Sequence, residues 1–179
     1  MTFSGETEEK LIKEAKTNAN AFAELYRRYV EKIYNFFYYH TFNISDTEDL
    51  TSVVFERVLT HLDDLKPGTN FSAWIFRIAH NCLVDFYRHS NKYKNQQNLE
   101  DIEVATEANI EHNLEKKEQT GILVKYLYIL PDLYKEVLIL KYHEELSNKE
   151  IGKSIGKSEG AVKQILRRAL KELREKMPE

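Results

Sequence analysis

The chain has 179 residues, of which 42% are hydrophobic and 31% charged, and its net charge at pH 7 is −3. This length allows one medium domain or two small ones, and the slight negative charge excludes a protein that holds DNA non-specifically through an overall positive surface. With only 6 Gly and 3 Pro, the composition favours an all-helical fold.

Several features that other protein classes need are missing from the sequence. A single cysteine, Cys82, permits no internal disulfide, and no Cys/His cluster has zinc-ligand spacing. No Ser/His/Asp arrangement, Gly-rich phosphate loop or paired-carboxylate motif indicates an enzyme. There is no signal sequence and no apolar run of the ~18 residues that span a membrane. We therefore expect a cytoplasmic, non-enzymatic protein that uses no metal or cofactor.

The first strong helical pattern follows a polar stretch, residues 6–17, which we expect to form a short helix or a frayed lead. From Ala21 to Tyr39, apolar and aromatic residues recur with the spacing of one helix face: Phe22, Leu25, Tyr29, Ile33, Phe36 and Phe37. This pattern predicts a long core helix, in which the tyrosines pack rather than bind a ligand.

A second helix is predicted from Ser45 to Leu62, because Ser45 and Glu48 fit a capping box. Its core face is expected to contain Leu50, Val54, Val58 and Leu62, widened by Phe55 and Leu59. Three carboxylates fall in the expected first turn, where they favour the positive end of the helix dipole: Asp46, Glu48 and Asp49. Capping can explain these acids, and so can a docking surface for a partner.

A loop with turn chemistry, Lys66–Asn70, precedes a third helix that we expect from Phe71 to His89. The predicted core face comprises Phe71, Ile75, Ile78, Cys82, Leu83 and Phe86, with Trp74 at its edge. A second face points outward and carries Arg77, Asn81, Val84 and Arg88. Cations interleaved with aromatics beside a flexible loop suit single-stranded nucleic acid, because phosphates meet cations while bases stack or enter a pocket.

Apolar periodicity is then lost from Ser90 to about Thr120, where the sequence is rich in Asn, Gln and Glu. This composition predicts a mostly disordered acidic linker. We therefore expect an all-α protein of two small helical domains, residues 1–94 and 121–179, joined by a flexible linker over residues 95–120. Beyond it, Pro131 suits the first position of a new helix that runs to Leu146.

The segment Ser147–Arg174 fits two helices joined by a tight corner. Ser147 and Glu150 form a capping box, and Gly156 permits the left-handed turn that ends the first helix. Ser158 can cap the second helix, whose inner face holds Val162, Ile165, Leu166, Ala169 and Leu173. A basic outer face is typical of the helix-turn-helix, whose second helix enters the major groove of DNA. The plainer alternative is an amphipathic hairpin with a solvated charged face.

Taken together, these elements resemble a bacterial RNA polymerase sigma factor of the extracytoplasmic-function type, a family with two helical domains called regions 2 and 4. The likeness covers nearly the whole chain after Ala19. Residues 21–39 and 45–62 look like the first helices of region 2, residues 71–89 like its promoter-reading segment, and residues 130–175 like region 4. The order and spacing of these motifs carry the resemblance.

The resemblance implies that the protein binds core RNA polymerase, at its clamp coiled coil and flap, and directs it to promoters. The residues that would dock on polymerase are Glu48, Asp49, Leu50, Phe55 and Glu56. The −10 element would be held as a single strand, with a base flipped into a pocket beside the loop, by Lys66, Thr69, Asn70, Phe71, Trp74, Arg77, Asn81 and Arg88. The −35 duplex would be read by Ser158, Glu159, Gly160, Lys163, Gln164, Arg167, Arg168 and Lys171. Many members of the family are held inactive by an anti-sigma factor, which is a further candidate partner.

Two places depart from the family pattern. Ser52 and Val53 stand where the family usually has a Gln-Glu pair that helps polymerase docking. Ile165 stands where an Arg often lies in the recognition helix, so we assign it to the core. The first departure keeps open a DNA-binding regulator that does not engage polymerase, and an enzyme acting on nucleic acid is a third class.

Overall fold

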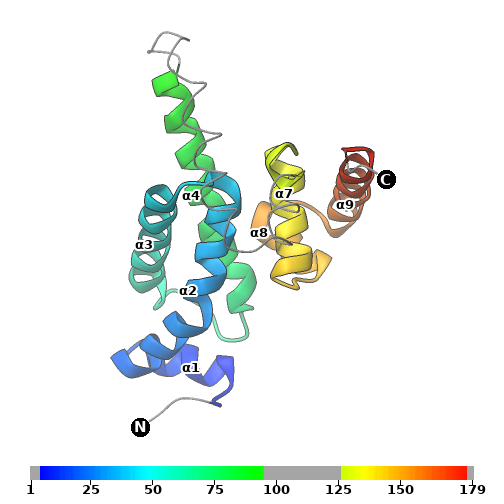
Figure 1. Ribbon diagram of the computed structural model, residues 1–179. Helices are drawn as coiled ribbons and strands as arrows, with labels where there is room; N and C mark the ends of the chain where they lie inside the picture. The colour runs from blue at the N-terminus through cyan, green and yellow to red at the C-terminus, as the bar shows by residue number, and fades with distance from the viewer. Residues whose placement is uncertain (1–4, 95–125, 177–179) are drawn as a thin grey trace.

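The computed structural model describes residues 5–94 and 126–176, and every regular element in these ranges is a helix (Figure 1). The first group comprises α1 (Glu8–Ala15), α2 (Ala19–Thr41), α3 (Ile44–His61) and α4 (Phe71–Lys94). The second comprises α7 (Asp132–Leu138), the π-helical turn η1 (Ile139–His143), α8 (Asn148–Ile155) and α9 (Glu159–Lys176). The predicted all-α class is confirmed.

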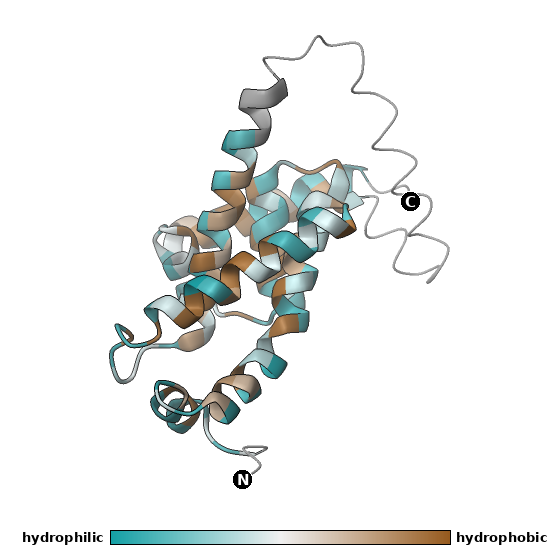
Figure 2. Ribbon diagram, turned by 90° about the vertical axis from the view of Figure 1, so that its left-hand side faces the viewer, coloured by the Kyte–Doolittle hydropathy of each residue, from teal (hydrophilic) through white to brown (hydrophobic). Residues whose placement is uncertain are grey.

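α2, α3 and α4 run side by side, and α1 packs against the beginning of α2 (Figure 1). Each helix presents hydrophobic residues on one side and hydrophilic residues on another (Figure 2), and the hydrophobic sides meet in the core. The predicted core face of α2 is confirmed, since Phe22 is half-buried and the others are buried: Leu25, Tyr29, Ile33, Phe36 and Phe37. Of the two possibilities for residues 6–17, the structure has the short helix, α1, with Leu11 fully buried.

Three expectations for α3 are wrong. The residue that caps the helix is Asn43, whose Oδ1 accepts a hydrogen bond from the Asp46 backbone at 3.0 Å, so Ser45 lies inside the first turn and forms no capping box. Asp46 remains in that turn, but Glu48 and Asp49 fall beyond it. Of the predicted core residues, only Leu59 lies outside the core, with 58% of its surface exposed, and the others are buried: Leu50, Val54, Phe55, Val58 and Leu62. The buried stripe also includes Thr47 and Thr51.

Helix α4 is buried on two sides. On the predicted side, Phe71, Ile75, Cys82 and Leu83 are buried, and Ile78 and Phe86 are half-buried. A second side, which the sequence pattern did not indicate, buries Ala73, Phe76 and Ala79 because α8 packs against α4. The helix also continues to Lys94, so residues 90–94 are not part of an irregular linker.

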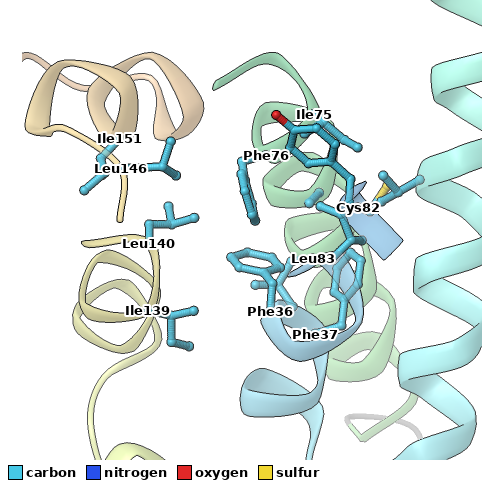
Figure 3. Packing of buried hydrophobic residues seen from close by; sticks show 14 of the residues in the cluster. Phe36, Phe37, Ile75, Phe76, Cys82, Leu83, Ile139, Leu140, Leu146 and Ile151 are labelled. Carbon is cyan, nitrogen blue, oxygen red and sulfur yellow. The ribbon is translucent and has the colours of Figure 1, made fainter. Parts of the chain in front are cut away.

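The two groups of helices pack against each other, α8 on α4 and α7 on α2. Leu140 and Leu146 point towards Phe36 and Phe76 across this contact (Figure 3), and all four side chains are almost fully buried. Apolar residues of both groups therefore form one continuous core. The predicted linker and the boundaries at residues 95, 120 and 121 lie outside the described residues and stay predictions.

Polar side chains also cross this contact. His80 of α4 lies 2.8 Å from the Glu136 carboxylate of α7, and this hydrogen bond raises the pKa of His80. Asn70 donates to Glu150 of α8 at 2.6 Å, and the Ser154 hydroxyl donates to the backbone carbonyl of Ala73 at 3.1 Å. The contact is thus partly polar, as contacts between domains usually are.

The segment before the helix-turn-helix differs from the single helix that we expected. Pro131 is the N-cap of α7 rather than its first helical residue. The helix then widens into the π-helical turn η1 instead of continuing to Leu146. Just beyond η1, the buried Glu144 carboxylate lies 2.7 Å from His143 Nδ1 and 3.9 Å from Lys32 Nζ of α2. The widened turn therefore delivers a carboxylate to the contact between the two groups.

His40, near the end of α2, is a buried titratable residue of the core. Its Nδ1 lies 2.7 Å from the carbonyl oxygen of Phe36. Burial lowers the pKa of His40 to about 3, and the nearby charges of Lys135 and His80 act in the same direction. The ring is therefore neutral in the folded protein at pH 7.

We expect His40 to make the folded protein sensitive to acid. In the unfolded chain its pKa is about 6.5, so below this pH the unfolded state binds a proton that the folded state does not. This difference should lower the free energy of unfolding by about 2 kcal/mol between pH 7 and pH 5. Urea unfolding at both pH values checks this, because His40→Gln should remove most of that loss. An equal pH dependence in the variant and the wild type would contradict it.

Candidate nucleic-acid interface

The corner between α8 and α9 has the geometry that the sequence predicts. Ser147 Oγ accepts from the Glu150 backbone at 3.2 Å, and Glu150 Oε2 accepts from the Ser147 backbone at 2.7 Å, which completes the capping box. Gly156 ends α8 in the left-handed conformation, with φ +68°. The Lys157 N–H then bonds to the Gly152 carbonyl at 2.8 Å, which is the long bond of a Schellman turn.

This turn brings backbone so close to Gly152 that a side chain has no room there. A Cβ added at Gly152 would lie 2.5 Å from the Lys157 carbonyl oxygen. The next helix starts at once, since Ser158 Oγ accepts from the Ala161 backbone at 3.2 Å. Gly152 and the caps at Gly156 and Ser158 therefore fix the angle between α8 and α9.

α9 separates an apolar side from a cationic side. Val162, Leu166 and Ala169 are buried, and Ile165 and Leu173 pack partly buried against the core, as predicted. All eight candidate −35 residues are exposed: Ser158, Glu159, Gly160, Lys163, Gln164, Arg167, Arg168 and Lys171. An open groove of about 720 Å³ runs along this side, and its cations are Lys163, Arg167, Lys171 and Arg174.

Two lysines of this cationic side are paired within the helix. Lys163 Nζ lies 2.8 Å from Glu159 Oε1, and Lys171 Nζ lies 3.6 Å from Glu175 Oε1. The hydrogen bond from Lys163 holds the pKa of Glu159 below its usual range. Both pairs are exposed, so their contribution to stability is small and either lysine is available to a stronger anion.

A second candidate surface lies where α3 and α4 meet. A cavity of about 350 Å³ brings together three of the predicted −10 residues, Trp74, Arg77 and Asn81. Arg77 and Asn81 are exposed, whereas Trp74 is half-buried and packs against Phe71 with ring centroids 5.5 Å apart. The cavity therefore offers an aromatic edge, a cation and an amide in one place.

Three residues of this cavity were missed by the sequence reasoning. Arg57, His61 and Asp64 come from the end of α3 and the residues after it. Arg57 and His61 are four positions apart, so they share one side of the helix. Their spacing was a usable signal, but only the packing of α3 on α4 shows that this side faces the cavity.

The other −10 candidates take different positions. Asn70 caps α4, since its Oδ1 accepts from the Ala73 backbone at 2.7 Å while its amide binds Glu150. Lys66 is exposed and Thr69 half-buried in the loop, and Phe71 is buried in the core. Arg88 lies further along α4, 3.0 Å from Asp85, and does not line the cavity.

A hollow of about 370 Å³ lies between this loop and α1. Residues 65–69 form one wall, and α1 with Lys16 forms the other. Residues 66–69 of the loop line this hollow, whereas the cavity between α3 and α4 is lined by residues before and after the loop.

The candidate polymerase residues on α3 divide by exposure. Glu48, Asp49 and Glu56 are exposed and form an acidic side, whereas Leu50 and Phe55 are buried. Phe55 packs against the Tyr26 ring at 4.6 Å between centroids. In this conformation the two apolar residues support α3 from within rather than offer a surface.

Two further findings apply to the part of the chain that the structure describes. None of its helices combines the length and apolar character needed to cross a membrane. Its His, Cys, Asp and Glu side chains nowhere gather in groups of three or more that could hold a metal ion.

Comparisons with known proteins match both groups of helices. Sigma-70 region 2 matches residues 25–93, and Sigma-70 region 4 matches residues 126–175. The chain is 31% identical to the ECF RNA polymerase sigma factor SigW of Bacillus subtilis (strain 168), over 94% of this chain and 95% of SigW. It is 30% identical to the RNA polymerase sigma factor YlaC of the same strain, over 86% of this chain and 90% of YlaC.

Solved structures agree with the fold. CnrH, determined in complex with the cytosolic domain of CnrY, has a TM-score of 0.73 at 24% identity, and the match covers 94% of this chain and 95% of CnrH. The sigma factor RpoE of Bartonella quintana, determined with the anti-sigma factor NepR, has a TM-score of 0.66 at 18% identity, covering 86% of this chain and 94% of RpoE. At these identities the likeness concerns the fold alone.

Proposed function

Since the chain belongs to the extracytoplasmic-function sigma factors of bacterial RNA polymerase, we propose that it reads a −35 element with α9, holds a −10 element at α4 and helps to open the DNA. Sigma factors bind core RNA polymerase and promoter DNA in transcription initiation, and the chemistry belongs to the polymerase. The observation that carries the proposal is the pair of exposed cationic surfaces, one on each group of helices.

The −35 part of the proposal is supported by the form of α9. Its apolar side is buried against α7 and α8, while its cations remain in water and face outward together. A helix in the major groove contacts bases mainly with its N-terminal residues and phosphates with cations beyond them. We therefore assign Lys163, Gln164 and Arg167 to bases and Arg168 and Lys171 to phosphates.

Lys163→Ala should weaken binding of −35 duplex by about 1–3 kcal/mol, because a side chain that contacts a base loses that contact. Lys176→Ala is a matched control. It removes a lysine from the same helix that also pairs with a glutamate four residues earlier, Glu172, at 4.0 Å. Titration of fluorescent duplex with the purified protein and polymerase measures both. Equal affinities of the two variants would contradict the assignment of Lys163.

The −10 part is supported by the cavity between α3 and α4. Trp74 offers an aromatic edge against which an unstacked base can lie, and Arg77 offers charge for a phosphate. Extruding a base from the duplex costs a few kcal/mol, which contacts to the captured base and strand must offset. Arg57 and His61 extend the set of candidate contacts to the strand.

Asn81→Ala should impair opening of the −10 element and leave −35 binding unchanged, because Asn81 is exposed in the cavity between α3 and α4 and does not line the groove of α9. Permanganate reactivity of thymines in the −10 region measures opening, and duplex titration measures −35 binding. Val84→Ala, a change on the same outward side of α4 that lines no such cavity, serves as the control. Unchanged opening and promoter selectivity in Asn81→Ala would remove this residue from the site.

Docking on polymerase is assigned to the acidic side of α3. Glu48, Asp49 and Glu56 are accessible there, and Leu50 and Phe55 hold the helix in place from the core. Ser52 and Val53, which replace the usual Gln-Glu pair, lie on the same helix, so we expect the acids to contribute a larger share of the binding. An anti-sigma factor is proposed as a further partner, because two proteins of the same fold were determined with a bound regulator or cytosolic partner domain.

One experiment tests the function as a whole. The protein is mixed with core RNA polymerase and a set of promoter fragments, and association, DNA opening and transcript formation are measured. Stable association with promoter-dependent transcription supports the proposal. Binding to duplex without association with polymerase would instead identify a helix-turn-helix regulator, and cleavage or modification of the DNA would identify an enzyme.

A further inference from the structure

α1 is attached to the chain where the candidate −10 loop begins. Lys16, which follows α1, donates from Nζ to the backbone carbonyls of Asp63 at 2.8 Å and Leu65 at 3.2 Å. These carbonyls lie just beyond the end of α3, where the chain has no helical partners for them. The side chain thus fixes the backbone directly before Lys66.

α1 is also connected, through Tyr29 of α2, to the residue that follows the loop. Glu8, the first residue of α1, accepts a hydrogen bond from the buried hydroxyl of Tyr29 in α2. The Tyr29 ring meets Phe71, the first residue of α4, edge to face at 5.0 Å between centroids. Burial and the contact with Glu8 raise the pKa of Tyr29, and Ser72 interacts with the same hydroxyl.

Apart from Asn70, whose side chain bonds to Glu150 and to the Ala73 backbone, the loop has little support between these two attachments. Residues 66–68 are exposed, and Gly68 has φ +75°. A single turn bond, from the Thr69 N–H to the Lys66 carbonyl at 3.1 Å, crosses the tip. The hollow of about 370 Å³ separates the loop from α1, so the two are in contact through their ends rather than along their length.

We propose that α1 sets the conformation of the loop Lys66–Asn70, with Lys16 and Tyr29 as the positioning residues at its two ends. This inference rests on the proposed role of the loop in holding the −10 strand. A loop held in its binding conformation before DNA arrives loses less conformational entropy on binding, so the attachments raise affinity without touching the strand.

A positioning role for Lys16 and direct contact of Lys16 with the strand predict different salt dependences of binding. If Lys16 bound a phosphate, its removal would lower the salt dependence of single-strand binding by roughly 0.7 in the slope of log K against log salt concentration. A positioning residue lowers affinity and leaves that slope unchanged. Affinity and slope together therefore separate the two roles.

The test uses the protein assembled with core RNA polymerase and a fluorescent single-stranded −10 oligonucleotide. Lys16→Met removes both hydrogen bonds and keeps much of the side-chain length. It should weaken binding about tenfold, which corresponds to about 1.4 kcal/mol, with an unchanged salt slope. Lys16→Arg, which can still donate to both carbonyls, should restore binding to within about threefold of wild type.

Lys10→Met is the matched control, because Lys10 belongs to α1, which Lys16 follows, and forms an exposed ion pair with Glu6 at 2.7 Å instead of a bond to the backbone before the loop. It should bind like the wild type. Tyr29→Phe removes the other attachment with little change of shape, and it should also weaken single-strand binding. Binding of −35 duplex by each variant verifies that the rest of the protein is intact.

The outcomes are distinguishable. Wild-type affinity in both Lys16→Met and Tyr29→Phe would overturn the inference alone, and so would a lower salt slope in Lys16→Met, since Lys16 would then touch the strand itself. If the wild-type assembly does not hold the oligonucleotide at all, the proposed function fails and the inference fails with it.

Discussion

Gly152→Ala is expected to lower the free energy of unfolding by about 3 kcal/mol, at the upper end of the usual effect of overfilling a packed site. The added Cβ would lie 2.5 Å from the Lys157 carbonyl oxygen, which is backbone and cannot rotate away as a side chain could. Relief requires the Schellman turn to open, and this changes the angle between α8 and α9. Binding of −35 duplex should therefore fall by more than tenfold, whereas association with polymerase through α3 should persist.

Gly160→Ala is the control for this prediction. Gly160 lies in the first turn of α9, and a Cβ there would meet nothing within 4 Å. Alanine is the better helix former, so this variant should be as stable as the wild type or more stable by up to about 1 kcal/mol. Urea unfolding followed by circular dichroism measures both variants. A Gly152→Ala protein of wild-type stability would mean that the corner is looser than its geometry indicates.

His80→Ala is expected to destabilise the folded protein by about 3 kcal/mol at pH 6, because it leaves a buried carboxylate without its partner. Only 6% of the Glu136 side chain is exposed, and His80 Nδ1 lies 2.8 Å from it. His89→Ala removes an exposed histidine from the same helix and should cost less than about 0.5 kcal/mol. Equal losses in the two variants would show that the pair contributes nothing.

The same pair predicts a double variant and a pH dependence. Replacing Glu136 by Leu in the His80→Ala protein removes the unpaired charge, so the double variant should be more stable than His80→Ala alone. The pKa of His80 is raised, so its contribution is complete below the unfolded value of about 6.5 and is lost as the pH rises through the folded value. The effect of His80→Ala should therefore be larger at pH 6 than at pH 9. Unfolding at these two pH values measures it.

Local patterns predicted most of the individual helices. Three such features depend on residues close together in the sequence, and the structure confirms each of them: the capping box at Ser147, the left-handed Gly156 and the inner side of α9. The resemblance to sigma factors is confirmed by the matches to regions 2 and 4. The start of α3 was missed because Asn43 and Ser45 both suit a cap, and only the backbone geometry decides between them.

Contacts between distant parts of the chain were not predictable in the same way. The second buried side of α4 contains Ala73 and Phe76, whose spacing alone does not say whether they meet solvent, a partner or α8. Arg57 and His61 belong to the candidate site because α3 packs beside α4, a contact that the sequence pattern does not predict. No sequence pattern indicated the contacts of Lys16 with the backbone after α3, because a lysine at the end of a polar helix usually points into water.

In the free protein, the Glu150 carboxylate already accepts one N–H of the Asn70 amide, which another acceptor would otherwise be able to use. This amide belongs to the loop that is proposed to hold the −10 strand, and it donates to the carboxylate of α8 at 2.6 Å. The amide has two N–H groups, so one remains available to a nucleotide, and a nucleotide that needs both must displace the Glu150 carboxylate, which lowers the measured affinity. Under the proposed function, the carboxylate that caps α8, the helix before the proposed −35 reader, would therefore compete with the −10 strand for the second N–H of this amide.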